Sequence, residues 1–288
     1  MIDISFSVDL DPYGTVITHL AERWVTNDQI AELAARFKFY DIEPTWFVRA
    51  DFFIRNRTGS VLDEMQSFLD AHGDSFWGWH PHLERGRDEA QQLVEIFDSI
   101  RSAGIYPSVI RVGEGRGSND ITSFVATSGI KIDCSAIPGR FRDDDQRTFD
   151  WRGCPNDLFW QNRNNYRFPQ HPLNGEVVQV PMTTALLKAS FDIEPKLRYL
   201  DLCFRHDVFS TGFVDAVNQG IKHIHVISHP ETLLEAGFEN GLYKSGWDNV
   251  RENLNFINDF NNFFLQGEIR LSNIQRVSRE FICRTVQF

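Results

Sequence analysis

Short apolar runs of strand length alternate along the chain with amphipathic stretches of helix length. The first run covers residues 2–8, and the stretch after it carries Ile30, Leu33, Ala34 and Phe37 at helical spacing. Further strand candidates lie at 44–49, 75–80, 107–112, 130–134, 176–181 and 223–228, with a late one near 280–286. Seven or eight parallel strands with intervening helices predict an α/β fold, either a barrel or an open doubly wound sheet.

Residues typical of helix ends fall between these strand candidates. Three pairs match an N-cap with its partner three residues later: Thr26 with Gln29, Ser60 with Asp63, and Asp88 with Gln91. Gly104 and Gly129 stand where helices are expected to stop. The positions of these expected helix ends therefore agree with the alternation of strands and helices.

Two segments depart from this alternation of strands and helices. Residues 135–175 have little periodicity and many turn formers, so we expect a long loop. Its aromatic residues, Trp151 and Tyr166 among them, lie amid arginine and asparagine, which favours contact with a substrate. Residues 235–288 predict only a helix and a strand. A single α/β barrel of 288 residues is ordinary, so we expect one domain over 1–288.

The charge balance bears on the choice of partner. The chain has 29 Lys and Arg against 40 Asp and Glu, a net charge of −11, and no run of basic residues. Nucleic acid and anionic membranes are therefore poor partners. The first residues lack the pattern of a signal peptide, and no apolar window is long enough to span a membrane. We expect a cytoplasmic protein that acts on a small molecule or glycan, and the oligomeric state stays open.

The first strand candidate ends in two aspartates. Alternation along a strand puts Asp9 and Asp11 on the same face at its C-terminal end, where α/β folds build their sites. Two carboxylates held close together tend to bind a cation or to share a proton. An isolated D-x-D is more often a pair of solvated turn residues, so the other strand ends decide its meaning.

The third strand candidate ends in two histidines. His80 and His82 share a face, and imidazole nitrogens bind zinc at about 2.0–2.1 Å. Alone, such a pair can equally be structural. Together with Asp11 it forms the two-histidine, one-carboxylate triad of catalytic zinc sites, which leaves open positions for water. Arg111 and His229 follow the fourth and seventh strand candidates and add polar groups at the same rim.

In chain order, these strand ends resemble the motifs of the polysaccharide deacetylases, carbohydrate esterase family 4. The resemblance covers residues 3 to about 232. The matching segments are SFSVDLD, PTWFV at 44–48, WHPHLE, Arg111 with Gly113 and Gly115, Asp133 with Ser135, and ISHP at 227–230. The resemblance implies a distorted (β/α)7, TIM-like barrel. It also implies a metal-dependent hydrolase that removes an acetyl group from an N-acetylated amino sugar.

The resemblance also implies roles for individual residues. Asp9 would be the base, Arg111 would hold it, and His229 would be the acid. The ligands of a divalent ion, zinc by preference, would be Asp11, His80 and His82. Substrate contacts are expected from Asp133, Trp151 and Tyr166.

Departures from the family pattern leave alternatives open. Typical members have adjacent aspartates and histidines four apart, whereas both pairs are two apart here, and Glu84 stands fourth after His80. Glu84 could therefore replace His82 as a ligand. The shortened arginine motif RVGEG gives no ground for inheriting specificity for chitin or peptidoglycan. Another metal-dependent amidohydrolase or phosphoesterase barrel is an alternative, although its H-x-H normally follows the first strand. The other alternative is a barrel that binds sugar without turnover.

Overall fold

The computed structural model describes residues 1–20, 23–49, 77–84, 86–102, 104–144, 147–172 and 175–286. The chain divides into two compact units. The first comprises Met1–Thr45 and Met182–Ile274, and the second comprises Trp46–Pro181 and Gln275–Phe288. Both contain strands and helices, which confirms the predicted α/β class. The expectation of one domain over 1–288 stays a prediction.

The first unit is built on the long strand β1 (Ile2–Leu10). It pairs in parallel with β13 (His223–Ser228) and with β14 (Ile269–Leu271). Even-numbered residues of β1 are apolar and buried, whereas Ser5 and Ser7 carry hydroxyl groups on the opposite face. Each hydroxyl lies 2.9 Å from a histidine Nε2 of β13. One face of β1 therefore belongs to the apolar core, and the other carries a polar row that leads to Asp9.

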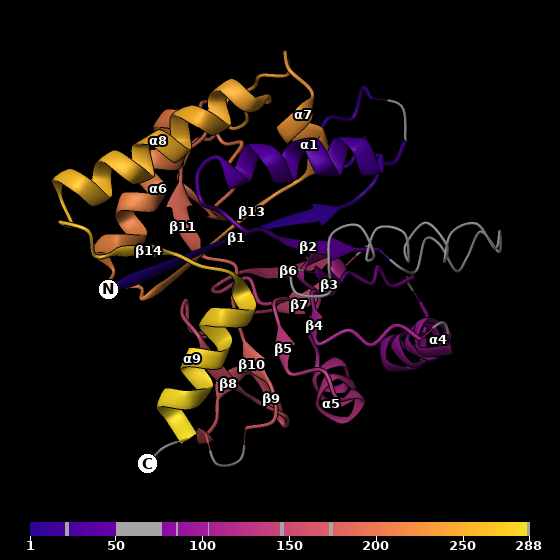
Figure 1. Ribbon diagram of the computed structural model, residues 1–288. Helices are drawn as coiled ribbons and strands as arrows, with labels where there is room; N and C mark the ends of the chain where they lie inside the picture. Colours follow the sequence, from indigo (N-terminus) through magenta and orange to yellow (C-terminus); the bar gives the residue numbers. More distant parts are fainter. Residues whose placement is uncertain are drawn as a thin grey trace. The chain divides into compact units, whose positions relative to one another are not determined.

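Helices and a hairpin complete the first unit (Figure 1). Their bounds are α1 (Asn27–Lys38), β11 (Thr184–Leu187), β12 (Lys196–Tyr199), α6 (His206–Asn218), α7 (Pro230–Leu234) and α8 (Trp247–Phe263). The predicted cap at Thr26 is confirmed, because its side chain accepts from Gln29 N–H and Gln29 caps Thr26 in return. Phe37 at the other end of α1 meets Trp247 edge-on, with ring centroids 5.3 Å apart.

The second unit contains most of β2 (Thr45–Val48) and a run of short strands. In parallel order these are β2, β3 (Trp77–Trp79), β4 (Val109–Ile110), β5 (Ile132–Asp133) and β10 (Val178–Gln179), continued by antiparallel β8 (Phe159–Asn162) and β9 (Asn165–Pro169). The helices α4 (Glu89–Ser102) and α5 (Asn119–Ser128) pack through Phe97 and Phe124 against Trp79. The five parallel strands match predicted runs, whereas β8 and β9 lie in the segment that was predicted as a loop.

The predicted helix ends in the second unit can be checked at three places. Gly104 follows α4, which ends at Ser102, and has a φ of 81°. The Asp88 carboxylate accepts from Gln91 N–H at 2.7 Å, as the cap pattern predicts. Gly129 ends α5 with a φ of 89°, a conformation that favours glycine. The predicted pair at residues 60 and 63 lies outside the described residues.

Two predictions of secondary structure need correction. The segment 135–175 is not one long loop, because it contains the hairpin of β6 (Phe141–Asp144) with β7 (Arg147–Asp150) and the hairpin of β8 with β9. The strand predicted near 280–286 is wrong, because those residues belong to α9 (Ile274–Val286). Figure 1 shows α9 beside β8, and Trp160 Nε1 donates to Thr285 Oγ1 at 2.9 Å.

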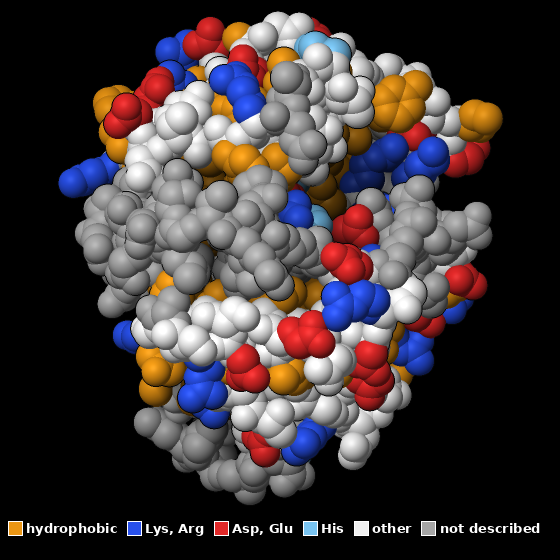
Figure 2. Space-filling view, turned by 90° about the vertical axis from the view of Figure 1, so that its right-hand side faces the viewer, with side chains coloured by type: hydrophobic (Ala, Val, Ile, Leu, Met, Phe, Trp, Pro, Cys, Tyr) orange, Lys and Arg blue, Asp and Glu red, His pale blue; other side chains and the backbone are white. Residues whose placement is uncertain are grey.

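The described helices and one face of the surface add two observations. None of the described helices is both long enough and apolar enough to cross a membrane. On the face seen in Figure 2, acidic and basic side chains are interspersed. The expected lack of binding to nucleic acid stays a prediction.

Candidate active site

His80 and His82, the histidine pair, follow β3 in the second unit. Their Nε2 atoms are 3.2 Å apart, and their ring planes stand at 86°. His80 is buried, and its Nδ1 lies 2.7 Å from the carbonyl oxygen of Arg111. Because a carbonyl only accepts, Nδ1 donates, and a neutral His80 then carries its lone pair on Nε2. That lone pair faces the ring of His82.

The separation of these two nitrogens fits a shared divalent ion. Tetrahedral zinc with bonds of about 2.0–2.1 Å would hold two ligand nitrogens about 3.3 Å apart. Histidine ligands usually donate their other N–H to a carbonyl or carboxylate, as His80 does to Arg111. His80 therefore has the tautomer of a zinc ligand, and the histidine pair has the donor atoms and the spacing of one half of a zinc site.

Gly113 fixes the position of the His82 ring. It begins the short 3-10 helix Gly113–Gly115, and its N–H donates to the carbonyl of Pro81 at 2.8 Å. A Cβ atom at Gly113 would lie 2.4 Å from Cδ2 and 2.5 Å from Nε2 of His82. A side chain there would displace the ring. Gly113 of the shortened arginine motif thus has a steric role that the sequence reading did not assign.

Arg111 is buried beside the histidine pair. Its Nε donates to the carbonyl of Cys134 at 3.3 Å, and its guanidinium carbon lies 4.0 Å from the centre of the Phe47 ring. Burial raises the pKa of the Asp133 carboxyl, and the positive charge of Arg111 is one of the influences that oppose the rise. Arg111 therefore supplies a fixed positive charge at the ends of β4 and β5.

Asp133 is held by protein groups. Its Oδ1 accepts from the N–H and hydroxyl of Ser135 at 2.8 and 2.6 Å, and Oδ2 accepts from Gln161 at 3.1 Å. The hydroxyl of Ser135 also accepts from Val112 N–H at 2.8 Å. This network ties the end of β5 to the segment that carries Arg111. Asp133 thus has a structural role, and its contact with a substrate stays a prediction.

The two aromatic residues predicted to contact the substrate differ in exposure. Trp151 is 0% exposed, and its Nε1 donates to the carbonyl of Gly115 at 2.6 Å. Tyr166 is partly exposed and meets Trp151 edge-on at 4.8 Å, while its hydroxyl donates to the carbonyl of Asp150 at 2.9 Å. A fully buried indole offers no face to a sugar, so the structure gives Trp151 a packing role. Substrate contact by Tyr166 stays a prediction.

Glu84, the alternative ligand, has a different environment from His82. Its side chain is 46% exposed, and its carboxylate lies 3.4 Å from the guanidinium of Arg87. Its N–H donates to Gln92 Oε1 at 2.7 Å, which anchors the backbone there. The surface ion pair favours His82 over Glu84 as the partner of His80.

The first unit carries the acidic residues. Asp9 and Asp11 at the end of β1 are both buried, and Asp11 N–H donates to the carbonyl of Asp9 at 2.8 Å. His229, which follows β13, has its Nε2 3.8 Å from Asp11 Oδ2. The first and last of the predicted motifs therefore meet in this unit.

Asp201 lies against the other nitrogen of His229, and the sequence reading missed it. Its Oδ2 is 4.0 Å from His229 Nδ1, and neither atom has a hydrogen-bond partner in the part of the chain that the structure describes. The other oxygen accepts from Cys203 N–H and Ser228 Oγ at 2.8 and 3.1 Å. Burial raises the pKa of Asp201 to about 6, although His229 opposes the rise. The imidazole thus lies between two carboxylates.

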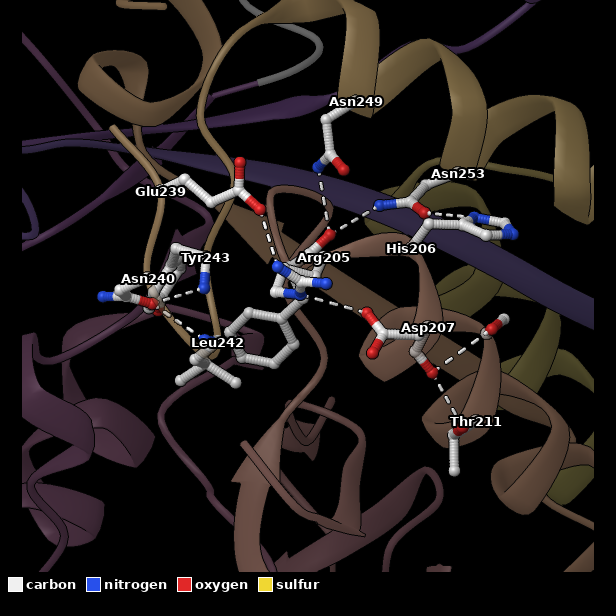
Figure 3. A network of polar contacts seen from close by, with 12 residues as sticks. Arg205, His206, Asp207, Thr211, Glu239, Asn240, Leu242, Tyr243, Asn249 and Asn253 are labelled. Carbon is white, nitrogen blue, oxygen red and sulfur yellow. Dashed lines mark hydrogen bonds and ion pairs between the residues drawn. The ribbon is translucent and has the colours of Figure 1, made fainter. Parts of the chain in front are cut away.

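The segment after Asp201 is anchored by two asparagines of α8 (Figure 3). Asn249 and Asn253 both donate to the carbonyl of Phe204, at 3.0 and 2.9 Å. The Oδ1 atom of Asn253 also lies 3.0 Å from Nδ1 of His206. These contacts fix the backbone that follows Asp201. Asp201 follows β12 by two residues, and no strand was predicted there from the sequence that could have marked it.

Comparisons with known proteins bear on the fold. No protein-family model and no curated protein matches the chain. A Mycobacterium smegmatis protein provisionally described as a polysaccharide deacetylase is similar with a TM-score of 0.55 and 11% identity, over 98% of this chain and 91% of that one. A Bordetella bronchiseptica protein, provisionally described as a polysaccharide deacetylase involved in O-antigen biosynthesis, has a TM-score of 0.40 and 11% identity, covering 99% and 90%. The first likeness confirms the predicted class of α/β barrel.

Proposed function

We propose that the protein is a metal-dependent hydrolase that removes the acetyl group from an N-acetylated amino sugar or a related glycan intermediate. The observation that carries the proposal is the histidine pair, whose Nε2 atoms lie 3.2 Å apart with Gly113 against one ring. Similarity in fold to the M. smegmatis protein supports a deacetylase-like reaction on a carbohydrate.

The resemblance in sequence assigns Asp11, His80 and His82 as the proposed ligands of the divalent ion. Two imidazoles and one carboxylate are the protein donor set of many catalytic zinc sites, which makes zinc the first choice. A divalent ion bound there supplies Lewis-acid polarisation of the substrate carbonyl. The surface ion pair of Glu84 supports His82 as the third ligand.

Proton transfer falls to residues of the first unit. Asp9 would accept a proton from the attacking water, and His229 would protonate the leaving amine. The resemblance in sequence assigns Arg111 to hold Asp9. Asp201 would accept from Nδ1–H of His229 when the 4.0 Å between the two atoms closes to a hydrogen bond of about 2.9 Å. That bond leaves Nε2 of His229 to face the substrate.

The same contact separates this proposal from its rivals. A barrel that only binds sugar gains nothing from a buried carboxylate beside a histidine, whereas a general acid needs a partner that fixes its orientation. Asp201 and His229 therefore favour turnover. The late position of the histidine pair along the chain argues against an amidohydrolase or phosphoesterase barrel.

The test combines metal binding with acetate release. Wild-type protein loaded with zinc should release acetate from at least one member of a panel of free, nucleotide-linked and oligomeric N-acetylated amino sugars. His82→Ala should lose both zinc and activity, and Glu84→Gln should keep both. The proposal fails if zinc-loaded wild type releases no acetate from the panel. It also fails if His82→Ala matches wild type in zinc binding and acetate release.

A further inference from the structure

Glu231 is a buried carboxylate that the proposed chemistry does not use. It is 1% exposed and stands in the first turn of α7, two residues after His229. Buried glutamates need partners, and those of Glu231 are three backbone N–H groups. Gly14 donates to Oε2 at 2.6 Å, while Val16 and Ile17 donate to Oε1, Ile17 at 3.2 Å. One carboxylate thus binds the backbone of a single short segment, residues 14–17.

The segment 14–17 lacks other regular structure. It follows the end of β1 and precedes α1, and Gly14 has a φ of 95°. Hydrogen bonds to a charged acceptor are stronger than those between neutral groups, and the three N–H groups converge on one side chain. Glu231 therefore anchors this part of the backbone.

The contact joins the two chain segments that carry Asp11 and His229. The ladder between β1 and β13 ends at the pair Val8 and Ser228, just before those two residues. Beyond it, hydrogen bonds between the strands no longer fix their separation. The bonds of Glu231 begin three residues after Asp11 and two after His229, so they restore a connection where the ladder stops.

We propose that Glu231 is a positioning residue that keeps Asp11 and His229 at their observed separation of 3.8 Å. Its catalytic consequence rests on the proposed function, whereas the connection itself does not. Glu231 acts through the backbone of residues 14–17 and touches no reacting atom.

Glu235 provides a matched control on the same stretch of chain. Its carboxylate pairs with the guanidinium of Arg23, and both side chains are partly exposed to solvent. The pair joins the same two parts of the chain through a surface contact. Exposed pairs contribute little to stability, so Glu235→Gln removes one negative charge nearby without releasing the segment 14–17.

The experiment compares Glu231→Ala, Glu231→Gln and Glu235→Gln with wild type. In Glu231→Ala, amide hydrogen exchange over residues 12–20 should rise, and the NMR signal of the His229 ring should move as it does in Asp11→Asn. Zinc affinity should fall about 10–100-fold, and kcat should fall by up to about 100-fold with KM changed much less. Glu231→Gln, which keeps an acceptor for Val16 and Ile17, should show smaller changes. Glu235→Gln should match wild type.

The outcomes separate this inference from the proposed function. Unchanged exchange over residues 12–20, or an unmoved His229 signal in a folded Glu231→Ala protein, overturns the positioning role. If wild type neither binds zinc nor releases acetate, the proposed function fails, while the exchange and NMR results still decide the role of Glu231. If Glu231→Ala does not fold, Glu231→Gln decides at Gly14, because the NH2 group of glutamine cannot accept from Gly14 N–H; unchanged exchange at Gly14 and an unmoved His229 signal then overturn the role.

Discussion

Replacing Gly113 by alanine tests whether the histidine pair binds a metal. The added Cβ would lie 2.4 Å from one atom of the His82 ring and 2.5 Å from Nε2. Carbon atoms pack at about 3.5–4.0 Å, so the ring must move by about 1 Å. Gly113 does not lie in the left-handed region, so the backbone itself accepts alanine. The change therefore acts through the position of His82.

The size of the effect follows from these distances. Ligand distances in metal sites hold to about 0.2 Å, so a shift of about 1 Å removes His82 from the ion. We expect zinc affinity to fall at least about 10–100-fold, the range for lost support of a ligand. Overpacking costs about 1–3 kcal/mol of folding free energy, and alanine returns about 0.4–1 kcal/mol by restricting the unfolded chain. The net loss of up to about 2.6 kcal/mol should leave the protein folded.

Gly117→Ala is the matched control. Its Cβ would lie 2.3 Å from Cζ2 of Trp151, so the clash with a buried ring is similar but does not involve a histidine. Zinc affinity is measured by competition with a chelator, and folding by thermal unfolding. Both variants should lose stability, and only Gly113→Ala should lose zinc. Wild-type zinc affinity in a folded Gly113→Ala protein would refute the assignment of His82 as a ligand.

Three further predictions concern the acidic residues and His229. Between pH about 4 and 6 the folded state holds the proton of Asp201 more tightly than the unfolded state, so stabilisation present at low pH is lost as pH rises. The free energy of unfolding of Asp201→Asn minus that of wild type, measured by denaturant titration, should therefore rise by up to about 3 kcal/mol between pH 4 and pH 7. A difference that stays the same at both pH values would contradict this. Asp9→Asn should abolish acetate release and keep zinc, whereas Asp11→Asn should lose both, and equal zinc loss would reject the division of roles. His229→Ala should lower kcat by about 10²–10⁴ with KM nearly unchanged. A wild-type kcat in steady-state assays would contradict the assignment of His229 as the general acid.

The sequence predicted regular elements best where burial sets a simple pattern. In β1 a buried apolar residue stands at every second position, β13 is buried along its whole length, and the cap of α1 is made by neighbours in sequence. The hairpin of β6 and β7 was missed because its strands, FRDD and RTFD, are mostly polar. The strand predicted near 280–286 reflects the branched and aromatic residues of that stretch. Burial of Ile274 and Val277 at helical spacing favours α9 instead.

In the candidate site, too, some residues could be predicted from the sequence and others could not. Residues at strand ends could be found from the sequence, because the ends of parallel strands are known places for functional groups. Asp201 could not be paired with His229 beforehand, because a bridge between Asp201 and Ile227 brings these distant parts of the chain together. The role of Gly113 depends on contact with a ring 31 positions earlier, and no local pattern encodes it.

The hydroxyl–imidazole pairs between β1 and β13 bear on how the chain folds during synthesis. Each pair joins residues 218 positions apart, so β1 stays without this neighbour until the ribosome has released residues 223–228. Contacts that distant close slowly, and an unpaired apolar strand edge invites association with other chains. Fragments that stop before residue 223 should therefore be prone to aggregation, because their first strand has an open edge.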